Sequence, residues 1–388
     1  MEILAITWNY PPRRGGMEQL LASLCDGLRK NHRVSVITAY ADKPQPAEER
    51  KVFRPGSPGL PAFFLYAFGK GASLLRGKSN VQIIFGGSAL VTPIVLLLAR
   101  LFRRKAVVQA HGLDLIYRSP VYQFFAVRWL RRVDLVIANS RYTAGLARAK
   151  GVHEKAIAVI PPGVDCERFH VEESADALKK DRELEGKRIV LFVGRLARRK
   201  GVKEFIERSL LHIVEEVPDA CFVIVGANPT ESLAHHDDVA GAIRQTIARL
   251  NLFDHVRWLG GVSDEELVKV YGLCDVLVLP VAAVKDDVEG FGIVALEAAA
   301  AGKPVVATGV GGIPDAVSDR QSGILVDAGD YDGLNQAVIS LLKNPDLAST
   351  MGEHGRRRVV SDFAWGRVVA RYEAEFSRLV GGNNSAAV

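Results

Sequence analysis

Short apolar runs rich in valine and isoleucine recur along the whole chain and alternate with segments long enough to form helices. Such alternation predicts parallel β-sheets that are covered by helices on both faces. We therefore expect an α/β fold built from doubly wound sheets. The predicted strands are Glu2–Thr7, Arg33–Thr38, Val81–Phe85, Ala106–Ala110, Asp134–Asn139, Ile189–Gly194, Cys221–Gly226, Val256–Gly260, Val276–Pro280, Pro304–Thr308 and Gly323–Asp327.

The same architecture occurs twice, so the 388 residues are expected to form two domains. The change from the first domain to the second falls after Pro161, where Pro-Pro-Gly-Val-Asp leads into a charged stretch without a strand pattern. Two such domains facing each other would enclose a deep cleft at the carboxyl ends of both sheets, where open α/β folds bind ligands. The expected division is an N-terminal domain over 1–170, a linker over 171–187, a C-terminal domain over 188–362, a helix over 363–380 and a flexible tail over 381–388.

No segment is predicted to direct export or to cross a membrane. Glu2–Thr7 lacks the preceding basic residues of a signal peptide and is typical of a buried first strand. The apolar stretch Ile83–Ala99 contains Gly86, Gly87 and Pro93, and it divides better into a strand, a turn and a buried helix. The scattered cysteines argue against disulfides and structural zinc and suit a reducing cytoplasm. They are Cys25, Cys166, Cys221 and Cys274.

Charge is distributed unevenly behind the net charge of +6. Residues 1–170 contain 25 Lys and Arg against 11 Asp and Glu, whereas residues 171–388 contain 25 against 33. A basic half favours an anionic partner such as a membrane surface, a phosphorylated acceptor or nucleic acid. A solvated basic face is the alternative. The aromatic and basic run from Phe63 predicts either a membrane-facing amphipathic surface or core packing; its members are Phe63, Phe64, Tyr66, Phe68, Lys70, Arg76 and Lys78.

Two loops after predicted strands have residues suited to phosphate. Gly15 and Gly16 precede a helix, where backbone N–H groups can approach an anion; a plain turn is the alternative. In the cationic loop after Gly194, Arg195 and Lys200 are expected to converge on a pyrophosphate. Arg198 and Arg199 of the same loop are expected to be solvated surface charges. No Walker lysine pattern occurs, which excludes a P-loop nucleotidase.

The segment from Asp287 to Glu297 is the most specific. Glu289 is expected in a glycine-rich loop, and Glu297 two turns into a helix that starts near Phe291. A loop carboxylate can hold sugar hydroxyls, a helical one can hold the two hydroxyls of a ribose, and the N–H groups of Gly290, Phe291 and Gly292 can meet phosphate. Two ordinary surface carboxylates are the alternative.

The remaining polar clusters are less specific. His111 follows a strand, and it is either a functional group or a hydrogen-bonded loop residue. Asp114 is expected to cap the following turn. Ser263 and Glu266 form a predicted capping box. Contiguous ligand-type residues rarely point at one ion, so no metal site is predicted; the stretches concerned are His235 to Asp238 and Asp286 to Asp287.

Taken together, these motifs resemble the retaining GT-B glycosyltransferases of family 4, in order and spacing across nearly the whole chain. The Glu-x7-Glu signature is present as Glu289 and Glu297, and the residues around Glu289 resemble the bacterial phosphatidylinositol mannosyltransferase branch. The other matching motifs are Gly15-Gly16-Met17-Glu18, His111-Gly112-Leu113-Asp114, Pro162-Gly163-Val164-Asp165 and Gly194-Arg195-Leu196 with Lys200-Gly201.

The resemblance implies two Rossmann-like domains and transfer of a hexose from a GDP-sugar or UDP-sugar to a lipid-linked or cell-envelope glycan. Arg195 and Lys200 would hold the diphosphate, Glu297 the ribose, and the segment around Val262 the base. Glu289 and the amides of Gly290 to Gly292 would hold the sugar, Gly15 and Gly16 the distal phosphate, and His111 the donor sugar beside the acceptor. It implies no obligatory metal or cofactor, no nucleic acid partner, and a cytoplasmic enzyme, peripheral at the inner membrane face.

Two other functions remain open at this point. A sugar-nucleotide epimerase with the same fold would release a changed sugar without an acceptor. A non-catalytic sugar-nucleotide sensor would bind the ligand without turnover, although the complete set of Arg195, Lys200 and Glu289 argues against it.

Overall fold

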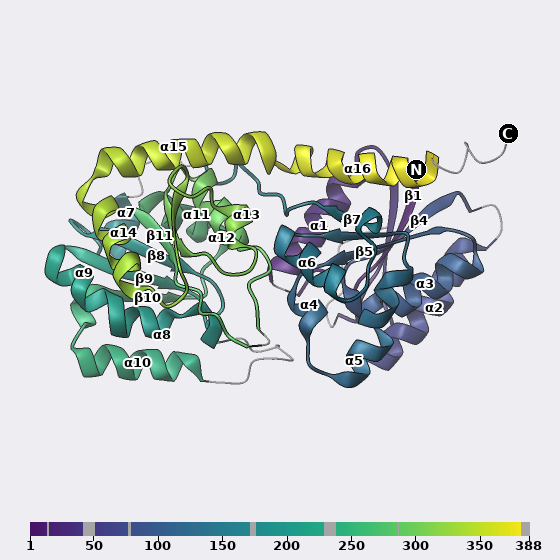
Figure 1. Ribbon diagram of the computed structural model, residues 1–388, viewed down its shortest axis with the longest axis horizontal. Helices are drawn as coiled ribbons and strands as arrows, with labels where there is room; N and C mark the ends of the chain where they lie inside the picture. The colour runs from purple at the N-terminus through teal and green to yellow at the C-terminus, as the bar shows by residue number, and fades with distance from the viewer. Residues whose placement is uncertain are drawn as a thin grey trace. The chain divides into compact units, whose positions relative to one another are not determined.

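The computed structural model describes residues 1–13, 15–41, 51–76, 79–170, 176–228, 238–285 and 287–381 (Figure 1). Its backbone contacts divide the chain into two compact units. Unit 1 contains Met1–Gly163 and Trp365–Val388, and unit 2 contains Val164–Ala364. The chain therefore leaves unit 1 once and returns to it near its end.

Unit 1 is built on a parallel sheet with the strand order β3-β2-β1-β4-β5-β6-β7 among the described residues. Its strands are β1 (Glu2–Ile6), β2 (Arg33–Ile37), β3 (Val52–Phe53), β4 (Val81–Gly86), β5 (Lys105–Ala110), β6 (Leu135–Ala138) and β7 (Ile157–Val159). Its helices are α1 (Gly16–Arg29), α2 (Leu60–Leu75), η1 (Ala89–Val91), α3 (Thr92–Leu101), α4 (Leu113–Ile116), α5 (Pro120–Phe125), η2 (Val127–Arg132), α6 (Arg141–Ala149), η3 (Glu154–Ala156) and α16 (Trp365–Gly381).

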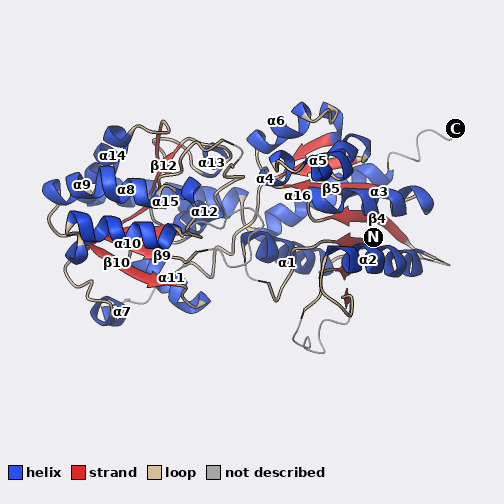
Figure 2. Cartoon of the chain, turned by 90° about the horizontal axis from the view of Figure 1, so that it is seen from below, coloured by secondary structure: helices blue, strands red, loops and turns tan. Residues whose placement is uncertain are grey.

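Unit 2 has a second parallel sheet, with the strand order β10-β9-β8-β11-β12-β13 among the described residues (Figure 2). Its strands are β8 (Arg188–Val193), β9 (Ala220–Val225), β10 (Val256–Gly260), β11 (Val276–Leu279), β12 (Val305–Thr308) and β13 (Gly323–Val326). Its helices are α7 (Asp176–Asp181), η4 (Arg198–Lys200), α8 (Val202–Phe205), η5 (Ile206–Leu210), α9 (Leu211–Glu216), α10 (Val239–Leu250), η6 (Phe253–His255), α11 (Asp264–Leu273), α12 (Ile293–Ala300), α13 (Ile313–Ala316), α14 (Tyr331–Lys343) and α15 (Pro345–Asp362).

These two sheets confirm the α/β fold class and every predicted strand to within one or two residues. The short edge strands β3 and β7 were not predicted, because two or three residues are too few to show a pattern. Ile83–Ala99 is the end of β4, a turn and most of α3. Among the described residues, no helix combines the length and the apolar character that a membrane crossing requires.

The boundaries between the units differ from the expected ones. The first falls between Gly163 and Val164, so the described part of the expected linker over 171–187 belongs to unit 2. The expected helix over 363–380 is α16, which belongs to unit 1 because its apolar face packs there. Of the expected tail over 381–388, residues 382–388 lie outside the described part of the chain.

Each sheet reverses its strand order at one point, next to its first strand. In unit 1 the reversal lies between β1 and β4, and in unit 2 it lies between β8 and β11. At such a switch point the two following loops diverge to opposite faces of the sheet and leave room at the carboxyl edge. The loops after these strands are therefore where a ligand site is expected in each unit.

Candidate functional site

The loops that follow β8 and β11 bring a buried group of charges together at the switch point of unit 2. The Arg199 Nη1 lies 2.5 Å from the Glu289 Oε2, and the Lys200 Nζ lies 2.6 Å from the same oxygen. The Arg199 Nε also lies 2.9 Å from the Asp287 Oδ1. The side chains of Arg199, Lys200 and Glu289 are only 8%, 11% and 13% exposed. We call these four residues the charged cluster.

Arg199 contradicts the sequence prediction of a solvated surface charge. The single turn η4 directs Arg199 and Lys200 inward, and two carboxylates from the β11 loop compensate the Arg199 guanidinium. Arg198, on the same turn, is exposed. No spacing rule distinguishes these two adjacent arginines, because their directions depend on where the β11 loop passes.

Arg195 and Lys200 were expected to converge, but they differ in burial. Lys200 is buried, whereas Arg195 is exposed at the start of the same loop. Arg195 is nevertheless close enough for its charge to contribute to lowering the pKa of Lys200. Three cations, Arg195, Arg199 and Lys200, thus lie in the same region as the Asp287 and Glu289 carboxylates, and an additional anion would offset this excess of positive charge.

Burial and neighbouring charges act in opposite directions on the charged cluster. For Glu289, burial alone would raise the pKa of the carboxyl, but Lys200 and Arg199 outweigh it and lower the pKa to about 2. For Lys200, burial lowers the pKa of the ammonium despite the adjacent Glu289 carboxylate. Glu289 is therefore ionised at neutral pH. Any further negative charge nearby would stabilise the protonated form of Lys200.

Glu297 lies on α12, as expected, and accepts a hydrogen bond of 2.7 Å at its Oε2 from the hydroxyl of Tyr271 on α11. Burial raises the pKa of Glu297, although the Tyr271 hydrogen bond and the charge of Arg168 oppose the rise. Tyr271 could not be predicted from the sequence, because a tyrosine in an amphipathic helix carries no signal of its partner. The hydrogen bond orients the Glu297 carboxylate.

The glycine-rich turn before α12 depends on a close backbone contact that the sequence analysis also missed. The helix begins at Ile293, two residues after Phe291, and Gly292 before it adopts the left-handed conformation with φ 87°. The Gly312 N–H donates a 2.9 Å hydrogen bond to the Glu289 carbonyl. A Cβ at Gly312 would stand 2.0 Å from the Gly290 carbonyl oxygen, so only glycine allows this approach.

Val262 follows β10 and packs, half-buried, against the core of unit 2. The next residue confirms the Ser263 half of the predicted capping box, because the Ser263 hydroxyl accepts a 3.1 Å hydrogen bond from the Glu266 N–H at the start of α11. The Glu266 carboxylate instead accepts a 2.5 Å hydrogen bond from Arg182. Val262 thus follows the carboxyl end of β10, which is separated from β8 by one strand, β9.

In unit 1, Gly15 and Gly16 follow β1 and begin α1. The Glu18 carboxylate folds back over this helix start, so that a Cβ at Gly15 would stand 2.4 Å from the Glu18 Oε2. The Asn9 side-chain amide donates a 2.7 Å hydrogen bond to the other Glu18 oxygen. One negative charge, that of the Glu18 carboxylate, therefore already lies at the N-terminus of α1.

His111 follows β5 and is buried beside the turn after β4. Its Nε2 lies 2.8 Å from the Gly87 carbonyl oxygen, which assigns the ring proton to Nε2. The Asp114 carboxylate accepts hydrogen bonds from the N–H groups of His111 and Ala89, at 2.8 and 3.0 Å. Asp114 thus joins the loops after β4 and β5 rather than only capping one turn, and it holds the His111 backbone beside the turn that follows β4.

Within the described ranges, no group of three or more His, Cys, Asp and Glu side chains has a metal-binding arrangement. His235, His236, Asp237 and Asp286 lie outside these ranges.

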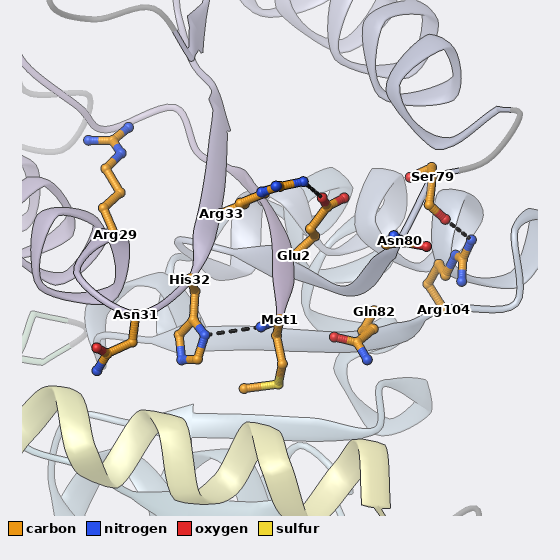
Figure 3. A pocket seen from close by; sticks show the side chains of 10 residues that line it. All are labelled: Met1, Glu2, Arg29, Asn31, His32, Arg33, Ser79, Asn80, Gln82 and Arg104. Carbon is orange, nitrogen blue, oxygen red and sulfur yellow. Dashed lines mark hydrogen bonds and ion pairs between the residues drawn. The ribbon is translucent and has the colours of Figure 1, made fainter.

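A shallow cavity of about 780 Å³ lies at the opposite edge of the unit 1 sheet (Figure 3). Met1, Arg33 and Gln82 line it at the amino ends of β1, β2 and β4. Its polar groups largely pair with each other: Arg33 contacts Glu2 at 3.0 Å, and Arg104 donates to the Ser79 carbonyl at 2.9 Å. This cavity is separate from the strand ends that carry the predicted site residues.

Comparison with known proteins identifies the family. Residues 174–358 match the family described as glycosyl transferases group 1, and residues 14–168 match glycosyltransferase family 4. A GDP-mannose-dependent alpha-(1-6)-phosphatidylinositol monomannoside mannosyltransferase of Mycolicibacterium smegmatis is 32% identical over 377 residues, which cover 94% of this chain and 95% of the relative. The chain belongs to the glycosyltransferases of group 1 and family 4.

Two further comparisons agree with this membership. The Mycobacterium tuberculosis protein of the same name is 31% identical over 395 residues, covering 97% of this chain and 98% of that protein. The crystal structure of Anabaena HepE in complex with UDP matches with a TM-score of 0.80 and 22% identity, over 97% of this chain and 100% of that one. The structural match shows the GT-B fold, and the charged cluster of this glycosyltransferase lies in the unit that matches group 1.

Proposed function

We propose that this glycosyltransferase moves a hexose of the mannose or glucose type from a nucleotide-diphosphate sugar to a lipid-linked or cell-envelope glycan, with retention of the anomeric configuration. The observation that carries the proposal is the charged cluster at the switch point of unit 2, where two cations share the Glu289 carboxylate. The names of the relatives, which specify GDP-mannose, support a GDP-sugar, and the HepE complex supports UDP as the alternative.

The charge balance of the site explains why a diphosphate would bind. Lys200 is buried and has one carboxylate oxygen as its anionic partner, which it shares with Arg199. A diphosphate would add charge-assisted hydrogen bonds to Lys200 and to the exposed Arg195. Arg199 would then keep Glu289 compensated while Lys200 turns toward the phosphate. These cations and the N–H groups from Gly290 to Gly292 would stabilise the leaving diphosphate, so we propose no obligatory metal or cofactor.

The remaining groups would fix the donor's orientation. Glu297, oriented by Tyr271, would accept hydrogen bonds from the ribose hydroxyls, and the backbone around Val262 would contact the base. Glu289 would hold sugar hydroxyls through its Oε1, because its Oε2 faces the cations. Gly15 and Gly16 would reach the distal phosphate, and His111 would contact the sugar beside the acceptor.

The proposed reaction needs no protein nucleophile. The acceptor hydroxyl oxygen would attack the anomeric carbon on the face from which the diphosphate departs. The bond from that carbon to the phosphate oxygen breaks, and the departing phosphate takes the acceptor proton. We place this reaction in the cytoplasm, at the inner face of the membrane where a lipid-linked acceptor would be presented.

The test is calorimetric titration of a panel of GDP- and UDP-sugars into wild type, Lys200→Met and the matched control Lys203→Met. Lys203 is more exposed and pairs with Glu207 instead. Loss of a desolvated charge contact costs about 2–5 kcal/mol, so Lys200→Met should bind the donor at least about 30-fold more weakly, with Lys203→Met unchanged. Because Lys200 has a lowered pKa, wild-type affinity should fall as the pH rises toward 10.5, and Lys200→Arg should remove that fall.

The proposal would be contradicted if no donor in the panel bound, or if Lys200→Met and the wild type bound the donor with equal affinity. Analysis of the released sugar by NMR separates the possible activities. Transfer with retention gives a new glycoside only when an acceptor is present.

A further inference from the structure

Unit 1 carries large apolar side chains that point into solvent from three neighbouring helices. Leu65 on α2, Leu97 and Leu101 on α3, and Val121, Phe124 and Phe125 on α5 are between 50% and 76% exposed. Phe68 on α2 is 38% exposed. Single exposed apolar residues are ordinary, but a group of them on adjacent elements marks an interaction surface.

The spacing within each helix shows that these side chains form outward stripes. On α5, Val121, Phe124 and Phe125 follow the i, i+3, i+4 spacing of one helical face. On α3, the exposed Leu97 and Leu101 are four residues apart, with the exposed Arg100 beside them. Opposite these stripes, the inner faces of α2 and α3 pack into the core of unit 1. The exposed stripes are therefore additional to the faces that fold the protein.

The three helices are neighbours in unit 1. α3 contacts both α2 and η2, and η2 contacts α5. In Figure 1, α2, α3 and α5 lie along the lower edge of unit 1, away from α1 and α16. We call this surface the α2–α3–α5 face, defined by the exposed apolar residues above and by the cations among them.

The charges on this face have one sign. Arg100, Arg103, Arg128, Arg131 and Arg132 are exposed on or next to α3 and η2. The Arg128 guanidinium lies 5.1 Å from the centre of the Phe124 ring, and that of Arg132 lies 4.5 Å from the Trp129 ring. Between Lys51 and Val133 the sequence contains one acidic residue, Asp114, whose carboxylate is engaged by backbone N–H groups.

We propose that the α2–α3–α5 face docks on the surface of a bilayer that contains anionic lipids. The leucine, valine and phenylalanine side chains would enter the acyl boundary, while the arginines would bind phosphate headgroups from the same helices. A second copy is a poorer occupant, because a symmetric contact would bring arginine-rich surfaces against each other without a carboxylate to compensate them. The inference rests on the proposed function only in that a lipid-linked acceptor would be within reach of the docked enzyme.

This surface differs from the one the sequence suggested between Phe63 and Lys78. Phe63 is buried in the core of unit 1, and Phe64 and Tyr66 are partly buried against it. Of that run, Phe68 and Arg76 are exposed, while Lys78 lies outside the described residues. The core-packing alternative is therefore correct for Phe63, and most of the exposed apolar surface comes from α3 and α5.

The experiment is flotation of the full chain with vesicles of phosphatidylcholine alone or with phosphatidylglycerol. We expect the wild type to float with the phosphatidylglycerol vesicles and to be released by raised salt, because screening shortens the reach of surface charge. Phosphatidylcholine alone should retain at least tenfold less protein, a loss of about the size expected when several arginines lose their anionic partners.

Two variants test the two parts of the face. Val121→Ser/Phe124→Ser/Phe125→Ser removes apolar contact, and Arg128→Gln/Arg131→Gln/Arg132→Gln removes charge. Each should reduce binding to phosphatidylglycerol vesicles about tenfold or more. The apolar control is Leu211→Ser/Phe253→Ser/Val360→Ser, which removes exposed apolar side chains of unit 2, 43% to 58% exposed. The charge control is Lys30→Gln/Arg367→Gln/Arg371→Gln, on α16 and at the end of α1.

Several outcomes would overturn the inference. These are a wild type that stays unbound with every vesicle, controls that lose as much binding as the test variants, and dimers in sedimentation that the apolar variant abolishes. Circular dichroism melting verifies that each variant is folded. Donor titration separates this inference from the proposed function, because the face variants should bind nucleotide sugar like the wild type even when they no longer float.

Discussion

At the scale of single residues, the candidate site depends on which charges are buried together. Arg198 and Arg199 are adjacent and chemically identical, yet one is exposed and the other contacts Asp287 and Glu289. Removing one member of a buried ion pair leaves the other without compensation, which is far more costly than losing a surface contact. Arg199 should therefore matter to stability and Arg198 should not.

We expect Arg199→Met to lower the free energy of unfolding by about 3–5 kcal/mol, because the buried Glu289 carboxylate loses one of the two cations that compensate it and Asp287 loses its contact with the Arg199 guanidinium. Arg198→Met, its exposed neighbour, should change the unfolding free energy by less than about 0.5 kcal/mol. Urea denaturation of both variants measures the difference. Equal stabilities would show that the charged cluster does not hold the loop.

The stability that Glu289 contributes should depend on pH with a defined sign. Its pKa in the folded protein is about 2, below the ordinary value of 4.5, so the contribution is complete above pH 4.5 and is lost as the pH falls toward 2. The wild type should exceed Glu289→Gln by about 3 kcal/mol at neutral pH. Urea denaturation at decreasing pH should show this gap closing. A gap that stays constant would contradict the assignment.

At the scale of elements, the site depends on tight contacts between loops that follow neighbouring strands. The turn at Gly312, after β12, supports the backbone of Glu289 and Gly290, after β11. Parallel strands bring such loops to the same edge, and glycine permits their backbones to meet. The position of the Glu289 carboxylate therefore depends on glycines that carry no functional group themselves.

Gly312→Ala should destabilise the protein by about 1–3 kcal/mol and weaken donor binding, because the new methyl group would collide with the Gly290 carbonyl. Gly145→Ala on α6 is the matched control. Its Cβ would meet no protein atom closer than 3.9 Å, and removing a helical glycine should stabilise by up to about 1 kcal/mol. Thermal denaturation and donor titration of the pair would show opposite signs of stability change. The same sign for both would argue against the steric account.

At the scale of the whole molecule, the chain returns to its first unit at the end. Tyr372 and Phe376 of α16 are buried, and their rings lie 6.2 and 6.1 Å from that of Phe85 on β4. Val369 also packs against Gly27 of α1. The last described helix is therefore part of the core of unit 1, although unit 2 precedes it in sequence.

Phe376→Ala should lower the unfolding free energy by about 3–5 kcal/mol, since it opens a cavity beside Phe85. Hydrogen exchange should accelerate in β1 and β4 of unit 1 and stay unchanged in β8 and β9 of unit 2. Phe253→Ala, at an exposed phenylalanine of unit 2, serves as the control. Faster exchange confined to unit 2 would contradict the assignment of α16 to unit 1.

Much of the architecture was accessible from local pattern. Buried parallel strands are apolar runs of several residues, so β1, β5, β8 and β12 could be recognised without any partner. Glu289 and Glu297 were recognisable because a glycine-rich turn separates them at a characteristic spacing. The edge strand β3 and the boundary after Gly163 were not, because they depend on contacts with distant residues.

The amino-acid sequence by itself determined the fold class, the longer strands and the family, because these follow from periodicity and from short motifs. Tertiary structure alone decided that Arg199 is buried, that Tyr271 orients Glu297, and that Gly312 supports Glu289. It also decided that α3 and α5, which carry exposed apolar side chains, each contact η2. The physical reason is that burial, ion pairing and exposure depend on what the neighbouring loops and helices bring, and those neighbours are far away along the chain.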